Sequence, residues 1–153
     1  MGILIRLAAL VIACFSVALT VQAQSGASTA EQQLFAGVNR ARKAQGLPGL
    51  KWNDALAAAA RRHAGVMAQH GTAEHGFPGE PSLASRANQA GAHFIYLAEN
   101  VIQGTSAEGI QEEFLKSPHH RANILDSDMD TIGVGVVERS GQLFAVEDFS
   151  KAK

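Results

Sequence analysis

Three polar residues of this 153-residue chain carry side chains that could do chemistry at a common site. His75 stands in a glycine-rich segment, and Glu99 lies in an apolar stretch where a charge is costly unless it is paired. His120 falls in the first turn of an expected helix, whose dipole favours the neutral imidazole that metal ligation or general-base catalysis requires. Two histidines and one carboxylate match a zinc site with three protein ligands and an open position.

Ser117 offers a second kind of chemistry, because it precedes His120 by three residues and Glu99 could orient the imidazole, as in a hydrolytic triad. No Gly-x-Ser-x-Gly elbow surrounds it. Ser117-Pro118 is also typical of a helix start, with the serine as cap and the proline in the first turn. We therefore favour the capping role. The residue types alone do not establish that His75, Glu99 and His120 converge.

Three further histidines have structural interpretations. His63 and His70 are seven residues apart on one expected helix and share a face. We expect His70 to be partly exposed, whereas His63 could face the core and form hydrogen bonds there. His93 is expected to be a structural or surface residue.

Capping signals predict two helices in the first half of the chain. Ser28-x-x-Glu31 forms a capping box, and apolar residues follow at helical spacing up to Gly46. Asn53 can cap a second helix over residues 54–70, which Gly71 would stop. Residues 71–105 are rich in glycine and polar residues and are expected to form an ordered loop, with a short helix over residues 83–89.

The second half of the chain predicts shorter elements. Thr105-x-x-Glu108 is a further capping box that opens a helix to residue 116, and a short helix covers residues 119–125. Residues 132–138 and 143–149 alternate as an antiparallel hairpin. The predicted fold class is therefore α+β, with helices packed on a small antiparallel sheet.

The first 23 residues indicate a secretory signal peptide. Arg6 supplies the positive charge, residues 7–19 form an apolar run, and Val21-Gln22-Ala23 fits the cleavage pattern. The apolar run spans only about 20 Å as a helix, too short for a stable membrane anchor. We expect a secreted or periplasmic protein with residues 1–23 as signal peptide, a short segment 24–29 and one domain over residues 30–150.

Charge and cysteine content exclude nucleic-acid binding and cysteine-dependent chemistry. The net charge is −1, and no block of basic residues is present to displace counterions from a nucleic acid. The single cysteine, Cys14, lies in the predicted signal peptide, so disulfides, thiolate metal sites and cysteine nucleophiles are excluded from the domain. We expect a monomer.

Several segments resemble a known family when taken in order. These are Asn39-x-x-Arg42, Leu50-x-Trp52, His63-Ala64, His75, Ala98-Glu99-Asn100, Ser117-Pro118-His119-His120-Arg121-Ala122-Asn123-Ile124-Leu125 and Gly133-Val134-Gly135. Together they are similar to a bacterial CAP domain, of the superfamily of cysteine-rich secretory proteins, antigen 5 and pathogenesis-related proteins. The resemblance covers residues 30–149.

The resemblance implies a three-layer α-β-α sandwich with one open cleft. Two histidines and two acids line the cleft in this family, and some members bind a divalent metal there. By motif, His75 matches the first histidine, Glu99 the acid, and His120, not His119, the second histidine. The resemblance thus implies that the three residues converge, with a divalent metal such as zinc as the possible cofactor.

One position departs from the family pattern. Many eukaryotic members have a second glutamate three residues after a helical tryptophan. Here Phe114 takes the aromatic place and Ser117 the acidic place. A metal would have fewer anionic ligands and should bind more weakly. Because Ser117 takes the acidic place, the expected ligand-binding set of the cleft is His75, Glu99, Ser117 and His120.

The family does not determine the function, and three hypotheses follow. The first is a secreted binding protein whose cleft takes a metal, a lipid, a small molecule or a cell-envelope ligand. The second is a hydrolase with His120 as general base and Glu99 as its orienting group or a metal ligand. The third is a structural or interaction domain in which the histidines and Glu99 form a buried hydrogen-bond network.

Overall fold

The computed structural model describes residues 26–153, and the predicted signal peptide lies outside this range. The elements in chain order are α1 (Thr29–Ala44), β1 (Lys51–Trp52), α2 (Asp54–His70), α3 (Leu83–Gln89), β2 (Phe94–Gly104), α4 (Ala107–Lys116), α5 (Pro118–Leu125), β3 (Thr131–Arg139) and β4 (Gln142–Ala152). Among residues 26–153, no helix is both long and apolar enough to cross a membrane.

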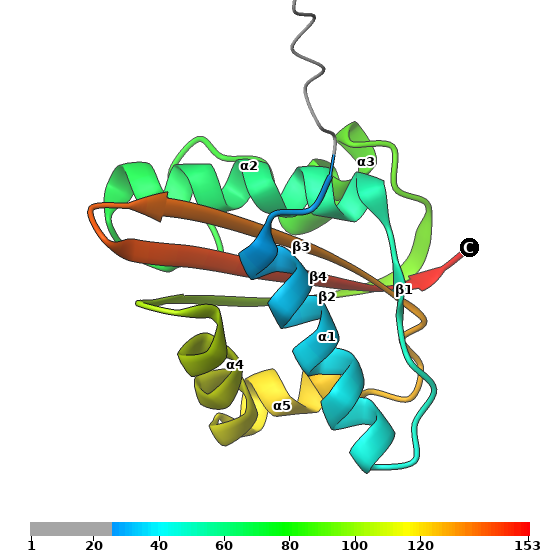
Figure 1. Cartoon of the computed structure of the whole chain (residues 1–153). Helices are drawn as coiled ribbons and strands as arrows, with labels where there is room; N and C mark the ends of the chain where they lie inside the picture. The colour runs from blue at the N-terminus through cyan, green and yellow to red at the C-terminus, as the bar shows by residue number, and fades with distance from the viewer. Residues whose placement is uncertain (1–25) are drawn as a thin grey trace, which may run out of the picture.

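One four-stranded sheet forms the middle layer, in the order β1-β3-β4-β2 (Figure 1). The strands β3, β4 and β2 are antiparallel neighbours, whereas the two-residue β1 pairs with β3 in parallel. Helices α2 and α3 cover one face of the sheet, and α1, α4 and α5 cover the other (Figure 1). The expected α+β sandwich is confirmed. The sheet contains both parallel and antiparallel pairs, because the short strand β1 runs parallel to β3.

Residues 94–104 correct the prediction of a loop, because they form the eleven-residue strand β2. The segment pairs with β4 from Phe94↔Ala152 to Gly104↔Leu143. Long-range pairing decides strand formation here, since the polar residues Glu99 and Asn100 interrupt the local pattern of alternation. As a result, Glu99 lies on an edge strand of the sheet.

The predicted caps are mostly present. The Ser28 and Glu31 side chains complete the capping box of α1, and the Asn53 side chain accepts from the backbone N–H of Leu56 at the start of α2. Helix α4 is capped by Ser106, not by the predicted Thr105. Ser117 and Pro118 take the predicted N-cap and first positions of α5, but the expected capping hydrogen bond from the Ser117 side chain is absent.

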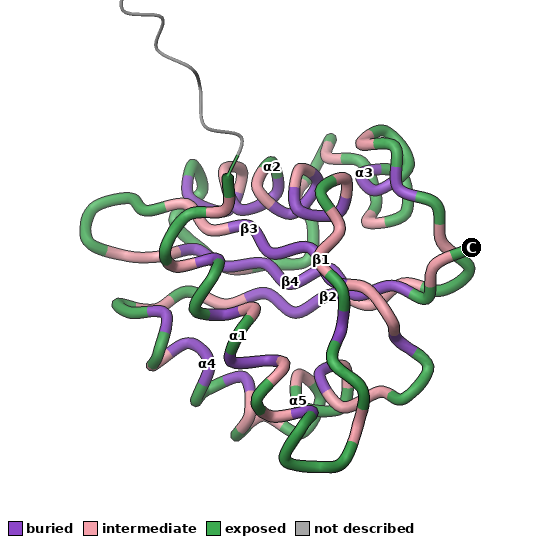
Figure 2. Tube along the Cα trace, turned by 45° about the vertical axis from the view of Figure 1, so that its right-hand side comes forward, coloured by how far each residue is buried: buried purple, intermediate pink, exposed green. Residues whose placement is uncertain are grey.

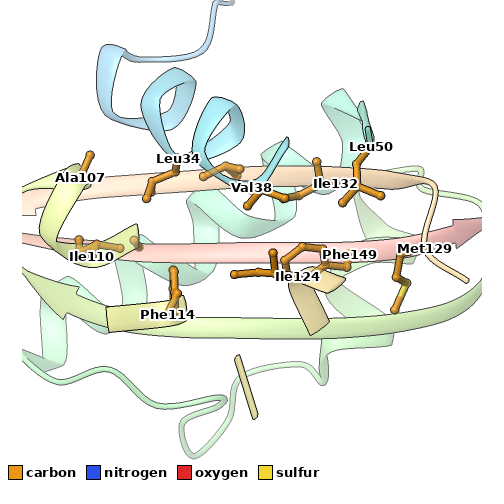
Figure 3. Packing of buried hydrophobic residues seen from close by; sticks show 12 residues of the cluster. Leu34, Val38, Leu50, Ala107, Ile110, Phe114, Ile124, Met129, Ile132 and Phe149 are labelled. Atoms are coloured by element: carbon orange, nitrogen blue, oxygen red, sulfur yellow. The ribbon is translucent and has the colours of Figure 1, made fainter. Parts of the chain in front are cut away.

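Large apolar side chains fill the space between the sheet and the α1, α4 and α5 layer (Figure 3). Phe114, Ile124 and Phe149 are fully buried there. On the opposite face, α2 approaches β3 at Gly133 and Gly135, where an added Cβ would lie 2.1 and 2.2 Å from backbone atoms of α2. Figure 2 shows that the strands and the inner sides of the helices are the buried parts of the fold.

Candidate functional site

Glu99 is the centre of the candidate site. Its side chain is nearly fully buried, and its Oε1 accepts a hydrogen bond from Nδ1 of His75 at 2.9 Å. Its Oε2 forms an ion pair with the buried guanidinium of Arg86 in α3. The His75 side chain itself is 65% exposed. An ionised carboxylate can only accept, so Nδ1 of His75 carries a proton, and in the neutral ring Nε2 is a hydrogen-bond acceptor.

His120 lies at the third position of α5, half-buried, with its ring edge-on to Phe114 at a centroid distance of 5.0 Å. Burial lowers the pKa of His120, and the charges of His75 and His119 lower it further. His120 is consequently neutral at physiological pH.

Asn100 ties His120 to the strand that carries Glu99. Its Nδ2 donates to the backbone carbonyl of His120 at 3.2 Å and to Oε2 of Glu147 at 3.0 Å. Asn123, one turn along α5, donates to Oδ1 of Asn100 at 2.9 Å and to the Glu99 carbonyl at 3.3 Å. These amide bonds dock α5 against β2. The backbone of His120 is therefore held by Asn100, the residue that follows Glu99 in the strand.

His63 holds the loop that carries His75. Its ring is fully buried, with Nδ1 2.6 Å from Oε1 of Glu80 and Nε2 2.9 Å from the carbonyl oxygen of Glu74. The carbonyl can only accept, so Nε2 carries a proton, and a second proton must lie between Nδ1 and Glu80. The prediction that His63 could form hydrogen bonds in the core is confirmed, and the bonds anchor the residue preceding His75.

Two buried acids on β4 lie beside the site. Asp148 is paired in register with Glu99, and burial together with the Glu99 charge raises its pKa well above the usual value. Glu147 faces the opposite side of the sheet, where burial raises its pKa to about 8. Glu147 is therefore protonated near pH 7, and burial favours the protonated form of Asp148.

The structure thus brings His75 and Glu99 into direct contact and links His120 to them through Asn100. Ser117 is half-buried, and its side chain makes no hydrogen bond among the described residues. His70 is exposed and stacks on Phe77 at 4.2 Å, and His93 is exposed, as expected for both.

Four buried partners of the site were not predicted, which are Glu80, Arg86, Glu147 and Asp148. A signal existed only for the last two, as adjacent acids within a strand otherwise rich in apolar residues. Arg86 in α3 resembles any surface arginine of a short helix, because the sequence does not show that α3 packs against α2 and β2.

A zinc site with three protein ligands does not fit these residues as they are arranged. No group of three or more His, Cys, Asp or Glu residues between residues 26 and 153 is placed to hold a metal ion. Both Glu99 oxygens are occupied, by His75 and Arg86. Zinc binding stays a prediction, and the two imidazoles are the only members of the set whose free nitrogens could take part.

Nδ1 of His120 is buried and has no hydrogen-bond partner, whereas Nε2 of the same ring is not among the buried atoms. Burying an unpaired N–H costs more than burying an unpaired lone pair. The favoured tautomer therefore places the proton on Nε2. His120 offers a donor, and His75 offers an acceptor.

An open cleft lined by these residues stays a prediction. A hollow of about 510 Å³ lies elsewhere, between α1 and α4, and is lined by residues that include Gln33, Arg40 and Gln111.

A three-layer sandwich that gathers two histidines and a glutamate at an edge strand defines the class of CAP, or SCP-like, domains. The chain belongs to the cysteine-rich secretory protein (CAP) family, whose model matches residues 35–149. It is 29% identical over 133 residues to the uncharacterized protein YkwD of Bacillus subtilis, which covers 86% of the chain. The chain spans about half the length (51%) of that relative.

Solved structures agree on the fold. An extracellular SCP-domain protein from Bacillus anthracis is 26% identical with a TM-score of 0.75, over 81% of this chain and 40% of that one. An outer surface protein from Borrelia burgdorferi is 22% identical with a TM-score of 0.74, over 81% of this chain and 93% of that one. The second likeness concerns the fold alone.

Proposed function

We propose that the protein is exported and binds a polar ligand of the cell envelope or its surroundings through His75 and His120. The observation that carries the proposal is the pair of complementary ring nitrogens, an acceptor on His75 and a donor on His120. Export is supported by the apolar run over residues 7–19 and by the similarity to an extracellular protein of Bacillus anthracis.

An acceptor on one ring and a donor on the other suit a ligand that has both functions. Sugar hydroxyls and peptide amides, which make up cell-wall fragments, have this property. Glu99 and Arg86 act by position, since their ion pair keeps the His75 ring in one tautomer. A bound metal would use lone pairs on both rings, which requires a proton on the buried Nδ1 of His120. That change costs about 1–3 kcal/mol for an unpaired buried donor.

Isothermal calorimetry near pH 7.5 with two probes, a disaccharide-peptide cell-wall fragment and zinc chloride, tests the proposal. We expect saturable one-site binding of the fragment, weakened at least about tenfold in His120→Ala, which corresponds to 1.4 kcal/mol. His119→Ala is the matched control, because His119 is exposed and adjacent, and should bind as the parent protein does. His120→Gln keeps a donor near the Nε2 position and should retain most of the affinity for the fragment.

Three outcomes contradict the proposal. Fragment binding that is equal in His120→Ala and the parent protein would place the ligand elsewhere. Zinc binding without fragment binding, lost in both His120 variants, would replace the polar ligand with a metal. Absence of binding with either probe would leave the histidines and Glu99 as a structural network.

A further inference from the structure

An apolar pair at the start of β2 stands apart from the histidine site. Ile95 is 70% exposed and Tyr96 is 52% exposed, and they are the exposed large hydrophobic residues of the described chain. Strand β2 is an edge strand, and here its register with β4 passes from Phe94↔Ala152 to Tyr96↔Lys151. Ile95 is the residue that this irregularity leaves without a partner.

The irregularity explains why both side chains are exposed. Successive residues of a regular strand point to opposite faces, so one of the two would be covered by the α2 layer or the α5 layer. An extra residue in an edge strand re-aims the side chains and also blocks pairing with another strand. The segment therefore presents side chains to solvent and is poorly suited to extend the sheet.

A hollow of about 290 Å³ adjoins the pair. Ile95, Tyr96, Asp126, Asp128 and Lys151 line it. Its volume equals that of about ten liquid waters at roughly 30 Å³ each, which suits one long side chain better than a larger ligand. The hollow thus combines an aliphatic side chain, an aromatic ring and two carboxylates.

Some charged groups around the hollow have a partner of opposite charge, and one does not. Lys151 is 3.2 Å from Oδ2 of Asp130, outside the hollow, and Asp126 lies near the guanidinium of Arg42. Asp128 is exposed and forms no ion pair with any residue between 26 and 153. The hollow therefore has an uncompensated negative charge next to an aromatic ring.

We propose that this surface, formed by Ile95, Tyr96, Asp126, Asp128 and Lys151, docks an arginine side chain of a protein or peptide partner. A guanidinium can pair with a carboxylate while stacking on the face of a tyrosine ring, which an ammonium does less well. Apolar neighbours of that arginine would cover Ile95. The partner class is thus a peptide segment with an arginine flanked by aliphatic residues.

The probe is the blocked tripeptide acetyl-Leu-Arg-Leu-amide, titrated into the ¹⁵N-labelled protein at low ionic strength. We expect saturable amide shift changes at residues 95–96, 126–128 and 151. Asp128→Asn should weaken binding at least about threefold, and Tyr96→Ser more than that. Glu138→Gln removes another exposed acid, at the other end of the β3–β4 hairpin, and is the matched control, with unchanged binding. Acetyl-Leu-Lys-Leu-amide should bind more weakly than the arginine peptide.

Three results would overturn the inference. Shift changes that are absent or lie outside these residues would show that the surface takes no arginine. Equal binding of acetyl-Leu-Glu-Leu-amide, or of Asp128→Asn, would show a purely apolar contact. Shift changes at residues 95–96 that grow with protein concentration alone would identify a second copy of this chain as the occupant. The ¹⁵N spectra of the variants also report whether each one is folded.

Discussion

The two faces of the sheet are stabilised by different means. Against α1, α4 and α5, the interior consists of large apolar side chains such as Phe114 and Phe149 (Figure 3). Against α2 and α3, part of the interior is a close backbone approach at Gly133 and Gly135. The rest of that layer includes a buried set of polar and charged groups, which are His63, Glu80, Arg86, Glu99 and Asp148.

This difference separates the interactions that stabilise the fold from those that position the site residues. Apolar burial is favourable in proportion to area and does not depend on a single geometry. A buried ion pair gains little net stability, but losing one partner leaves an uncompensated charge. The polar network therefore fixes the orientation of His75, and apolar burial on both faces, which is more extensive against α1, α4 and α5, provides the free energy that offsets the cost of burying this network.

The largest expected effect is on the apolar face. Phe114→Ala removes a fully buried ring from the middle of the cluster and should lower the free energy of unfolding by about 4 kcal/mol, measured by urea denaturation. Phe114→Leu keeps much of the apolar volume and should lose less than half as much. Similar losses in the two variants would show that ring contacts, including the one with His120, matter more than volume.

The polar face should respond to loss of one charge. Arg86→Met leaves the Glu99 carboxylate buried without its cation, and we expect a loss of about 3 kcal/mol in the free energy of unfolding. The double variant Arg86→Met/Glu99→Gln removes both charges and should recover part of that loss.

The His75 ring gives a second readout of the double variant. Its ¹⁵N chemical shifts should show a mixed tautomer in Arg86→Met/Glu99→Gln, whose amide can either accept from or donate to the ring, but an unchanged one in Phe114→Leu. An unchanged tautomer in both would contradict the assigned role of the Glu99–Arg86 pair.

The sequence predicted the elements that depend on local signals. The capping residues Ser28 and Asn53, the stop at Gly71 and the hairpin all follow from short-range geometry, and each is confirmed. Strand β2 was missed because its existence depends on pairing with β4, about fifty residues away. Ser117 was correctly placed at the N-cap of α5, but its capping hydrogen bond was wrongly predicted because Pro118 starts the helix without one.

The candidate site was predicted only in part for the same reason. His75, Glu99 and His120 were found from residue type, local context and family resemblance. The groups that hold them in place come from α2, α3 and β4, and their partners are set by tertiary packing. Asn100 illustrates the limit, since its bonds to His120 and Glu147 join three elements that no local pattern relates.

Glu147 is a buried acid on the otherwise apolar face. Its presence should make the free energy of unfolding depend on pH. Its folded-state pKa of about 8 lies above the unfolded value of 4.5, so the folded protein holds a proton that the unfolded chain releases. Its contribution to stability is therefore full below pH 4.5 and is lost as the pH rises from there to about 8. Within that window the free energy of unfolding should fall by about 1.4 kcal/mol per pH unit from this group.

Glu147→Gln keeps an oxygen that can accept from Asn100 but carries no titrating proton. Between pH 6 and pH 7, urea denaturation should therefore show the parent protein losing about 1.4 kcal/mol relative to this variant. The exposed Glu138→Gln should lose stability in parallel with the parent. Because Asp148 titrates in the same direction, only the difference between parent and Glu147→Gln isolates Glu147. Parallel pH profiles for the two proteins would mean that Glu147 ionises in the folded state without cost, and that the apolar face admits water or a cation beside it.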